Sequence, residues 1–300
     1  MTRIVVLGSV NLDLIVPVER QPRPGETLIG GDRSEADGGK GGNQAVAAAR
    51  LGADVWFVGR VGDDEQGVRL RATLEGEGID VSHLAVDPVA PSGMALITVA
   101  RGGENAIVVS PGANGRVDRS DVDGALELIA SADILVLQHE IPAEAVEAAI
   151  VVAAGAGVRT ILNPAPARPI PAATLANIAV LAPNRSELGV LGGAGEPETA
   201  DEAATLARTI SGPDAVVVTL GGDGALIVEG GDQTLVPAPP ADVVDTTGAG
   251  DAFCGALAVR LAEGALLPEA VRFAVRAAAL SVHAEGARAG MPRRSDLGST

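Results

Sequence analysis

The stretch VVDTTGAGDAF, residues 243–253, is the most informative part of this sequence, because an apolar run leads there into a glycine-rich turn and an expected helix. The small residues Gly248, Ala249 and Gly250 let the backbone turn tightly and leave its N–H groups uncovered. The tail DAFCGALAVRLAEG is typical of a helix, and a helix that begins near Ala249 puts those N–H groups at its positive end. The pattern predicts an anion site, typically for phosphate, with the carboxylate of Asp251 beside it.

Short apolar runs alternate with helical patterns on either side of this stretch. The runs are RIVVLGS, ADVWFVGRVG, DILVLQ, VRTILN, IAVLAPN and AVVVTLG, and the helical patterns between them are NQAVAAARLG, GVRLRATLEGEG, AEAVEAAIVVAAG and DEAATLARTI. Runs that are apolar on both faces and separated by helices are typical of a parallel sheet covered on both sides. The fold class predicted from the pattern is therefore α/β, with a central, mostly parallel sheet.

Two segments interrupt this alternation. DLIVPVERQPRPGETLIGG and SGMALITVARGGENAIVVS resemble extended ribbons with polar turns, and GGEN is a hairpin signal. Neither segment has a helix to cover it, so we expect each to project from the sheet as a small β flap, at about residues 12–36 and 92–110. The chain has no internal repeat and no linker-like change of composition, which favours a single domain over residues 1–300.

Composition excludes several classes of function. A formal charge of −17, with three Phe, one Trp and no Tyr, argues against nucleic acid, which needs clustered basic residues and aromatic stacking. The three histidines are scattered without zinc-ligand spacing. No apolar stretch is long enough to predict a membrane span, and the first segment is expected to be a strand, not a signal peptide. The single cysteine, Cys254, excludes an intrachain disulfide, fits a reducing cytoplasm and is expected to lie in the core.

Taken singly, the polar motifs remain ambiguous. GGKGGNQAVAAARLG, residues 38–52, lacks both the P-loop pattern and the dinucleotide-binding glycine pattern, and is either a polar site at a helix start or a plain glycine-rich connection. Asn11 and Asp13, in GSVNLD, follow a strand and are either polyol ligands or turn residues. In LAPNRSE, Asn184 and Glu187 share a helix face or form a helix cap, and TLGGDGALIV is consistent with an ordinary hairpin.

Taken together, the motifs resemble the pattern of a known enzyme family. GSVNLD, GGKGGNQA, LNPAPA, APNRSE, VTLGGDGA and DTTGAGDAF occur in the order and spacing of the ribokinase (PfkB) family of carbohydrate kinases, over nearly the whole chain. The segments PRPGETL, SGMALI, PGAN and QHEIP are similar to the ribokinases within this family rather than to its fructokinases or adenosine kinases. The resemblance implies a ribokinase-like three-layer sandwich with a small β lid, and transfer of the γ-phosphoryl group of ATP to O5 of D-ribose, with Mg²⁺ and K⁺.

The resemblance also implies roles for individual residues. Asp251 is the expected base, and Gly248, Ala249 and Gly250 form the anion hole. The expected sugar ligands are Asn11, Asp13, Gly39, Lys40, Gly41, Gly42, Asn43, Glu140 and Asp251. The expected nucleotide and Mg²⁺ contacts are Asn184, Glu187, Thr219, Leu220, Gly221, Gly222, Asp223, Gly224, Gly250 and Asp251. The expected K⁺ ligands, mostly through backbone carbonyls, are Asp245, Thr247, Ser281, Ala284, Gly286 and Gly290. Flaps of two subunits commonly pair in this family, which implies a homodimer.

Two positions depart from the family pattern, and several functions stay open. Gly42 replaces a usual alanine, which we expect to do little beyond loosening a helix start, and Val275 replaces a polar residue near the adenine. A kinase for fructose, deoxyribose or a nucleoside is the alternative within the family, although a nucleoside kinase would be expected to stack its base on aromatic residues. A sugar-binding regulator without catalysis is the alternative outside it, and the retention of Asp251 with its glycine-rich turn argues against that function.

Overall fold

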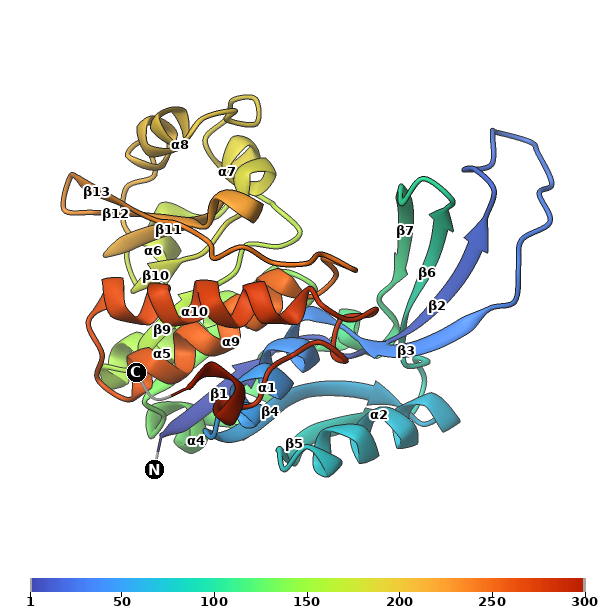
Figure 1. Ribbon diagram of the computed structural model, residues 1–300. Coiled ribbons are helices and arrows are strands. Elements are labelled where there is room, and N and C mark those ends of the chain that lie inside the picture. The colour runs from blue at the N-terminus through green and yellow to red at the C-terminus, as the bar shows by residue number, and fades with distance from the viewer. Residues whose placement is uncertain (1, 299–300) are drawn as a thin grey trace.

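The computed structural model describes residues 2–298 and has a nine-stranded sheet at its centre (Figure 1). The strand order is β13-β12-β11-β10-β9-β8-β1-β4-β5, parallel from β11 to β5 and antiparallel at β12 and β13. The strands are β1 (Arg3–Leu7), β4 (Asp54–Gly62), β5 (Asp80–Asp87), β8 (Ile134–Leu137), β9 (Arg159–Leu162), β10 (Val180–Leu181), β11 (Ala215–Thr219), β12 (Ala225–Glu229) and β13 (Asp232–Val236).

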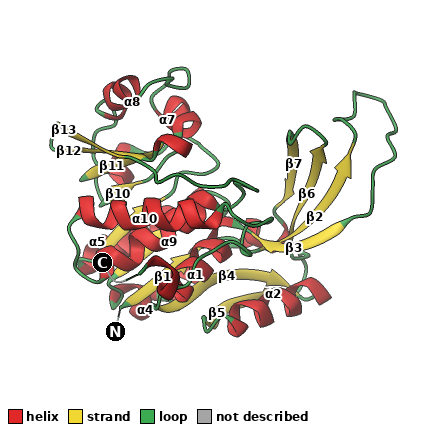
Figure 2. Ribbon diagram, viewed as in Figure 1, coloured by secondary structure: helices red, strands yellow, loops and turns green. Residues whose placement is uncertain are grey.

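Helices cover both faces of this sheet and form two separate cores. One core joins the sheet to α1 (Lys40–Arg50), α2 (Glu65–Gly76), α9 (Ala249–Ala262) and α10 (Leu267–Ser281). The other joins the opposite face to α3 (Arg119–Gly124), α4 (Leu126–Ala130), α5 (Ala143–Ala156), α6 (Ala172–Leu175), α7 (Arg185–Leu191) and α8 (Ala200–Ala207). The predicted three-layer α/β sandwich is confirmed, and Figure 2 shows its strands lying between the two sets of helices.

The sheet contains more strands than the apolar runs predict. β5 was not predicted, because its sequence DVSHLAVD mixes polar and apolar residues, as expected of a strand at the edge of a sheet. The hairpin reading of TLGGDGALIV is confirmed, since β11 and β12 pair antiparallel around the short 3₁₀ turn Gly221–Asp223. The predicted run IAVLAPN contributes only the two residues of β10.

The two interrupting segments combine into one structure. β2 (Asn11–Val18), β3 (Ser34–Gly38), β6 (Gly93–Ala100) and β7 (Asn105–Ser110) form a second, four-stranded sheet in the order β3-β2-β6-β7. This sheet, here called the lid, stands away from the sandwich on the right of Figure 1. Two separate flaps were expected, but β2 and β6 pair in parallel along their whole length and so join them. The remaining 3₁₀ turns are Gly112–Arg116 and Arg294–Leu297.

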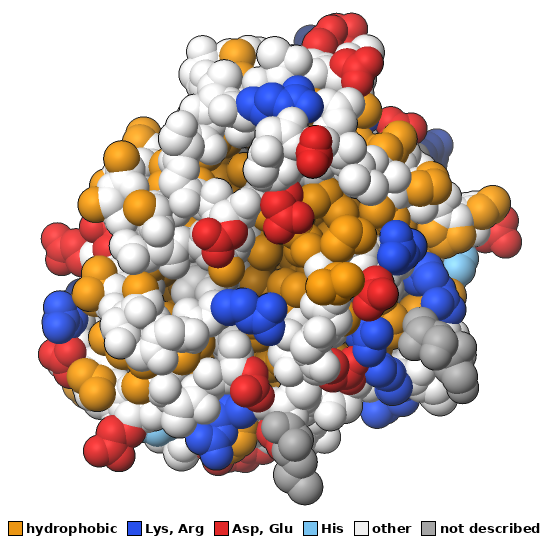
Figure 3. All heavy atoms as spheres, turned by 90° about the vertical axis from the view of Figure 1, so that its left-hand side faces the viewer, with side chains coloured by type: hydrophobic (Ala, Val, Ile, Leu, Met, Phe, Trp, Pro, Cys, Tyr) orange, Lys and Arg blue, Asp and Glu red, His pale blue; other side chains and the backbone are white. Residues whose placement is uncertain are grey.

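The face opposite the lid mixes acidic and basic side chains around an apolar hollow (Figure 3). A cavity of about 220 Å³ opens near this end of the sheet between β9, β10 and the end of α9, and its lining includes Arg159, Asp214 and Glu229. Among residues 2–298, no helix combines the length and the hydrophobicity that crossing a membrane requires.

Candidate active site

The sequence-predicted site residues gather at the carboxyl edge of the parallel strands, where open α/β sheets bind ligands. Two helices begin side by side at this edge. α1 begins after Gly39, with φ 82°, and α9 begins after Gly248, with φ 79°. A Cβ atom on Gly248 would lie 2.6 Å from the carbonyl oxygen of Ala287, so both the backbone angle and the packing require glycine there.

Asp251 lies in the first turn of α9 and is held by side chains from α1. Its Oδ2 accepts a hydrogen bond of 3.0 Å from Nδ2 of Asn43, and its Oδ1 accepts one of 3.0 Å from Nε2 of Gln44. The residue is only 6% exposed. Two donated hydrogen bonds fix the orientation of the carboxylate, and no Lys or Arg within residues 2–298 forms an ion pair with it, so its oxygens keep lone pairs that can accept a proton.

Gln44 is the residue of this network that received no role from the sequence. It is fully buried, and its Oε1 accepts a hydrogen bond of 2.7 Å from Nε2 of Gln138. Its Nε2 also lies 3.2 Å from Oδ1 of Asn163, which follows β9. A glutamine next to Asn43 in GGKGGNQA was visible as a polar residue at a helix start, but only the packing of α9 against α1 shows that it points inward.

Backbone N–H groups at the start of α9 are available for an anion, with one exception. The N–H of Ala249 donates to the carbonyl of Thr246 at 3.2 Å, which closes the turn before the helix. Among the described residues, the N–H groups of Gly248, Gly250 and Asp251 have no backbone acceptor. The expected anion hole therefore has its free donors on either side of Ala249.

The expected sugar ligands lie between the start of α1 and the base of the lid. Asn11 is buried and accepts a hydrogen bond of 2.7 Å from Nδ2 of Asn114. Glu140 accepts from the hydroxyl of Ser9 at 2.5 Å and from the N–H of Lys40 at 3.0 Å. Asp13 lies on β2, and burial, followed by the charge of Glu140, raises its pKa to about 7.

A polar cavity of about 200 Å³ lies in front of Asp251. Lys40, Asn184, Glu187, Thr246, Gly248 and Gly250 line it with Asp251. Burial alone would lower the pKa of Lys40, but the negative charges of Asp251, Glu140 and Glu187 outweigh it and raise the pKa. The ammonium group therefore stays charged at neutral pH and attracts an anion into this cavity.

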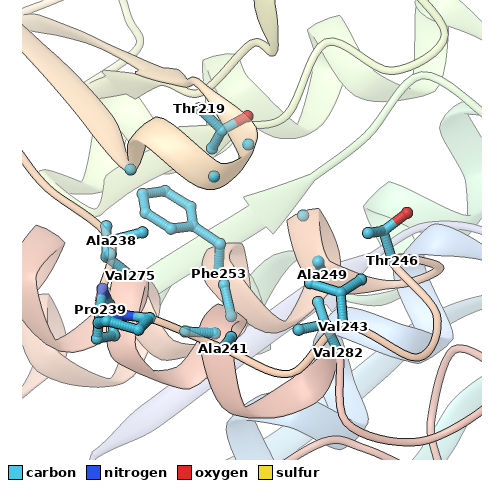
Figure 4. Close-up of a pocket in the computed structure, with 17 residues that line it drawn as sticks. Thr219, Ala238, Pro239, Ala241, Val243, Thr246, Ala249, Phe253, Val275 and Val282 are labelled. Atoms are coloured by element: carbon cyan, nitrogen blue, oxygen red, sulfur yellow. The ribbon is translucent and has the colours of Figure 1, made fainter.

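A larger, apolar pocket of about 510 Å³ adjoins the polar cavity. The two share Thr219, Thr246 and Gly250 as lining residues. Figure 4 shows the side chains of Val243, Phe253, Val275 and Val282 gathered around the pocket, below Thr219. Gly221, Gly222 and Gly224 also line it, whereas Leu220 and Asp223 do not, because Leu220 is buried in the core and Asp223 forms an ion pair of 2.7 Å with Arg185.

Asn184 and Glu187 form a reciprocal helix cap at the start of α7. The N–H and the side-chain amide of Asn184 donate to Glu187 at 2.9 and 3.0 Å, and the N–H of Glu187 donates back to Oδ1 of Asn184 at 2.8 Å. Burial is the main reason that the pKa of Glu187 is raised. A carboxylate offers about four lone-pair sites, so the cap leaves capacity for a hydrated cation. Cap and ligand are therefore compatible roles for this pair.

Asp245 ties the loop before α9 to the segment after α10. Its Oδ1 accepts from the N–H of Thr247 at 2.9 Å and its Oδ2 accepts from the N–H of Gly286 at 2.8 Å. Burial opposes the charge, but these hydrogen bonds outweigh it and lower the pKa of Asp245. The carbonyl oxygen of Ser281 faces Gly290, where a Cβ atom would lie only 1.9 Å from it. The loop and the C-terminal segment thus meet where the family resemblance implies a cation.

The charged residues of the described chain do not form a metal site of the usual kind. No three His, Cys, Asp or Glu side chains within residues 2–298 gather as they would around a metal ion. Any cation at the two places above would therefore need carbonyl, hydroxyl, water or phosphate oxygens in addition to the single carboxylate of Glu187 or Asp245. Mg²⁺ bound largely by phosphates and water, and a large monovalent ion bound by carbonyls, both fit that description.

Free N–H groups that can bind a phosphate stand beside the Asp251 carboxylate, which can take a proton from a hydroxyl, and the polar cavity in front of them adjoins an apolar pocket. Phosphoryl transfer to a small molecule requires such an arrangement, which indicates a small-molecule kinase. The pfkB family carbohydrate kinase description matches residues 1–294, and the chain belongs to this family. The ribokinase of Bacillus subtilis is 41% identical over 298 residues, covering 99% of this chain and 98% of that protein. A deoxyribokinase of Salmonella typhi is 36% identical, covering 96% and 95%.

Solved structures agree with this assignment. The structure of an Arabidopsis thaliana ribokinase complexed with ribose and ATP superposes with a TM-score of 0.92 at 35% sequence identity, covering 99% of this chain and 98% of that chain. Since the Bacillus subtilis and Arabidopsis thaliana ribokinases both match over nearly the full length, the recognised family and the ribokinase-like fold are confirmed.

Proposed function

We propose that this chain is an ATP-dependent ribokinase that transfers the γ-phosphoryl group of ATP to O5 of D-ribose. The observation that supports this most directly is the placement of Asp251 on the wall of the polar cavity, which adjoins the apolar pocket, with its carboxylate held by Asn43 and Gln44. A nucleotide in the apolar pocket would reach the polar cavity with its phosphates, and a sugar beside Asn43 would present a hydroxyl to Asp251. Similarity to ribokinases over the whole chain supports the choice of sugar.

In this mechanism Asp251 orients the sugar hydroxyl and accepts its proton late in the transfer. A strong base is unnecessary, because a loose phosphoryl-transfer transition state gains little from early deprotonation. The N–H groups of Gly248, Gly250 and Asp251, with Lys40, stabilise negative charge on the transferred group. Asn11, Asp13 and Glu140 hold the sugar by paired hydrogen bonds, since a small polyol offers little apolar surface. Gly39, Gly41 and Gly42 shape the backbone around it.

Two cations complete the proposal. Asn184 and Glu187 would hold Mg²⁺, largely through water, and the ion would neutralise charge on the phosphates. Asp245, Thr247, Ser281, Ala284, Gly286 and Gly290 would hold K⁺, mostly through carbonyl oxygens. The role of this second group is to fix the loop before α9, so that the N–H groups near Gly248 are oriented before the reaction begins.

We further propose that the lid closes over the sugar and pairs with the lid of a second subunit. Its strands β6 and β7 expose apolar side chains, namely the cross-strand pair Leu96 and Val108 on one face, at 49% and 65%, and Ile107 on the other, at 54%. Exposed apolar side chains on neighbouring strands favour burial in a homodimer. Closure would exclude water, which would otherwise compete as acceptor. The chain is expected to work in the cytoplasm, where a single free thiol stays reduced.

An assay of ADP release across ribose, deoxyribose, fructose and nucleosides, with the product identified by NMR, tests the function. Ribose should give the highest kcat/KM and yield the 5-phosphate. A higher value for deoxyribose would replace the proposed substrate, and sugar binding without turnover would favour a sugar-binding regulator. Light scattering at several protein concentrations tests the homodimer, and a charged substitution at Ile107 should yield monomers if the lids pair.

A further inference from the structure

The side chain of Arg288 lies behind the sugar clamp and has no role in the mechanism above. It is only 9% exposed, although arginine is rarely buried in proteins. Its Nε donates to Oδ1 of Asn43 at 2.9 Å, and its Nη2 donates to the carbonyl of Gly38 at 2.9 Å. Nη1 has no hydrogen-bond partner within residues 2–298. A buried, partly unsatisfied guanidinium destabilises a fold, so its presence at an active site points to function.

Gly42 makes the position of this guanidinium possible. A Cβ atom on Gly42 would lie 2.5 Å from Nη2 of Arg288, closer than a side chain can approach. The expectation that glycine at position 42 merely loosens the helix start is therefore incomplete. The guanidinium of Arg288 occupies the space that the methyl group of an alanine would need.

Two contacts connect Arg288 to the clamp. Through Nε it holds the carbonyl oxygen of the Asn43 side chain, which leaves Nδ2 of the same amide directed at Asp251. Through Nη2 it holds Gly38, and Asp13 packs directly over Gly38, since a Cβ atom there would lie 2.2 Å from Oδ2 of Asp13. One side chain thus touches the supports of both carboxylates.

The structure assigns Gly42 and Arg288 as a coupled positioning pair for the sugar clamp. The space at Gly42 admits the guanidinium, which orients Asn43 toward Asp251 and places a fixed positive charge near Asp13. This inference deepens the proposed function and rests on it. The ligand that this pair serves is a polyol, whose hydroxyl groups donate hydrogen bonds to an ionised and correctly placed acceptor.

The charges around Asp13 show why a cation is useful there. Burial and the negative charges of Glu140, Asp37 and Asp251 all raise the pKa of Asp13, and Arg288 is the group that lowers it. Burial lowers the pKa of Arg288 to about 10, so the guanidinium remains charged at neutral pH. Without it the pKa of Asp13 would rise further, so a larger fraction of its carboxyl groups would be protonated at neutral pH and would lose part of their capacity to accept hydrogen bonds from the sugar.

The test is a mutant cycle with Gly42→Ala, Arg288→Met and the double variant, with Gly155→Ala as control. Gly155 lies in α5, and a Cβ there meets no atom within 4 Å. Gly42→Ala should raise KM for ribose about tenfold with little change in KM for ATP. The double variant should be no worse than Arg288→Met, because the methyl group then displaces nothing. A ribose KM within twofold of the parent in both single variants, or additive effects, would overturn the pair.

The pH profile separates charge from packing. Asp13 titrates near 7, so kcat/KM for ribose should fall as the pH drops below that value. Arg288→Met should move this limb upward by about one pH unit, and Arg288→Lys should keep it near the parent position while still raising KM. An unmoved limb in Arg288→Met contradicts the charge role.

NMR titration of the Asp13 carboxyl carbon, without substrate, compares the pKa of Asp13 in the parent and in Arg288→Met even if neither protein is active. This measurement does not depend on Gly42→Ala, so the charge role can be tested even if that variant fails to fold. A parent that is inactive on ribose but shows the Asp13 shift in Arg288→Met would refute the proposed function and leave the Arg288 charge effect standing. An active parent without the shift would do the reverse.

Discussion

The starts of α1 and α9 have the same backbone design and present different chemistry. Each helix begins after a glycine with positive φ, and this glycine has no side chain to cap the first N–H groups. At α1 the carboxylate of Glu140 accepts from the N–H of Lys40 instead, whereas the N–H groups of Gly250 and Asp251 in α9 have no backbone acceptor among the described residues. The start of α1 directs two side-chain amides toward its neighbour, whereas the start of α9 presents a carboxylate and free backbone N–H groups. A helix N-terminus therefore supplies a favourable field for anions, but the side chains around it determine what that field does.

The different roles of the two helix starts follow from the way α9 packs against α1. Gly255 lets α9 approach α1, since a Cβ there would lie 2.6 Å from the Cβ of Ala47. That approach brings the amides of α1 within hydrogen-bond distance of Asp251. We expect substitutions at the start of α9 to affect turnover, and substitutions around α1 and the lid to affect sugar binding and the order of the site.

The largest expected effect is at Asp251. Asp251→Asn should lower kcat by about 10³-fold, because the proton of the sugar hydroxyl loses its acceptor in the transition state. Ribose binding by calorimetry should persist. Asp242→Asn, an exposed position on the preceding loop, is the matched control and should behave like the parent. Turnover within tenfold of the parent would remove Asp251 as the base.

Asp13 belongs to neither helix start and tests whether sugar affinity comes from the lid side. Asp13→Ala should weaken ribose binding by about 1.5–3 kcal/mol for each hydrogen bond lost to a charged acceptor. This corresponds to at least a tenfold rise in KM per bond. KM for ATP should stay the same. An unchanged KM for ribose would mean that Asp13 is only a residue of the β2 strand.

Gln44→Leu tests the support that α1 gives to α9. It removes one donor from Asp251 and leaves the side-chain amide of Gln138 without its acceptor. We expect about a tenfold loss of kcat and a melting temperature lower by a few degrees, since an unsatisfied buried group costs about 1–3 kcal/mol. Gln66→Leu, on α2, is the control. Full activity in Gln44→Leu would show that Asn43 alone orients the base.

The smallest expected effect concerns the loop that precedes α9. In a Tris background with saturating Mg²⁺, added K⁺ should raise the rate of the parent several-fold by fixing the orientation of the N–H groups near Gly248. Asp245→Ala should flatten that response, since it releases Thr247 and Gly286. Equal parental rates with and without K⁺ would show that protein contacts alone set this loop.

Much of this molecule could be predicted from local patterns in the sequence. Alternating apolar runs and helical segments predicted the layered sheet, because burial on both faces leaves a continuous apolar signal in each strand. The helix start at Ala249 followed from a run of small residues before an apolar helix pattern. The site residues that were recognised lie in short motifs directly after strands, where the chain order already implies a shared edge of the sheet.

What the sequence did not reveal depends on contacts between residues far apart in the chain. The union of two flaps into one lid needs the pairing of β2 with β6, and no local pattern encodes that partner. The side chain of Gln44 points inward because α9 packs against α1. Glycine at position 42 matters because it leaves room for Arg288, which lies 246 residues later. Local propensity and periodicity act over a few residues, whereas burial, hydrogen-bond partners and charge in a site are set by packing across the whole fold.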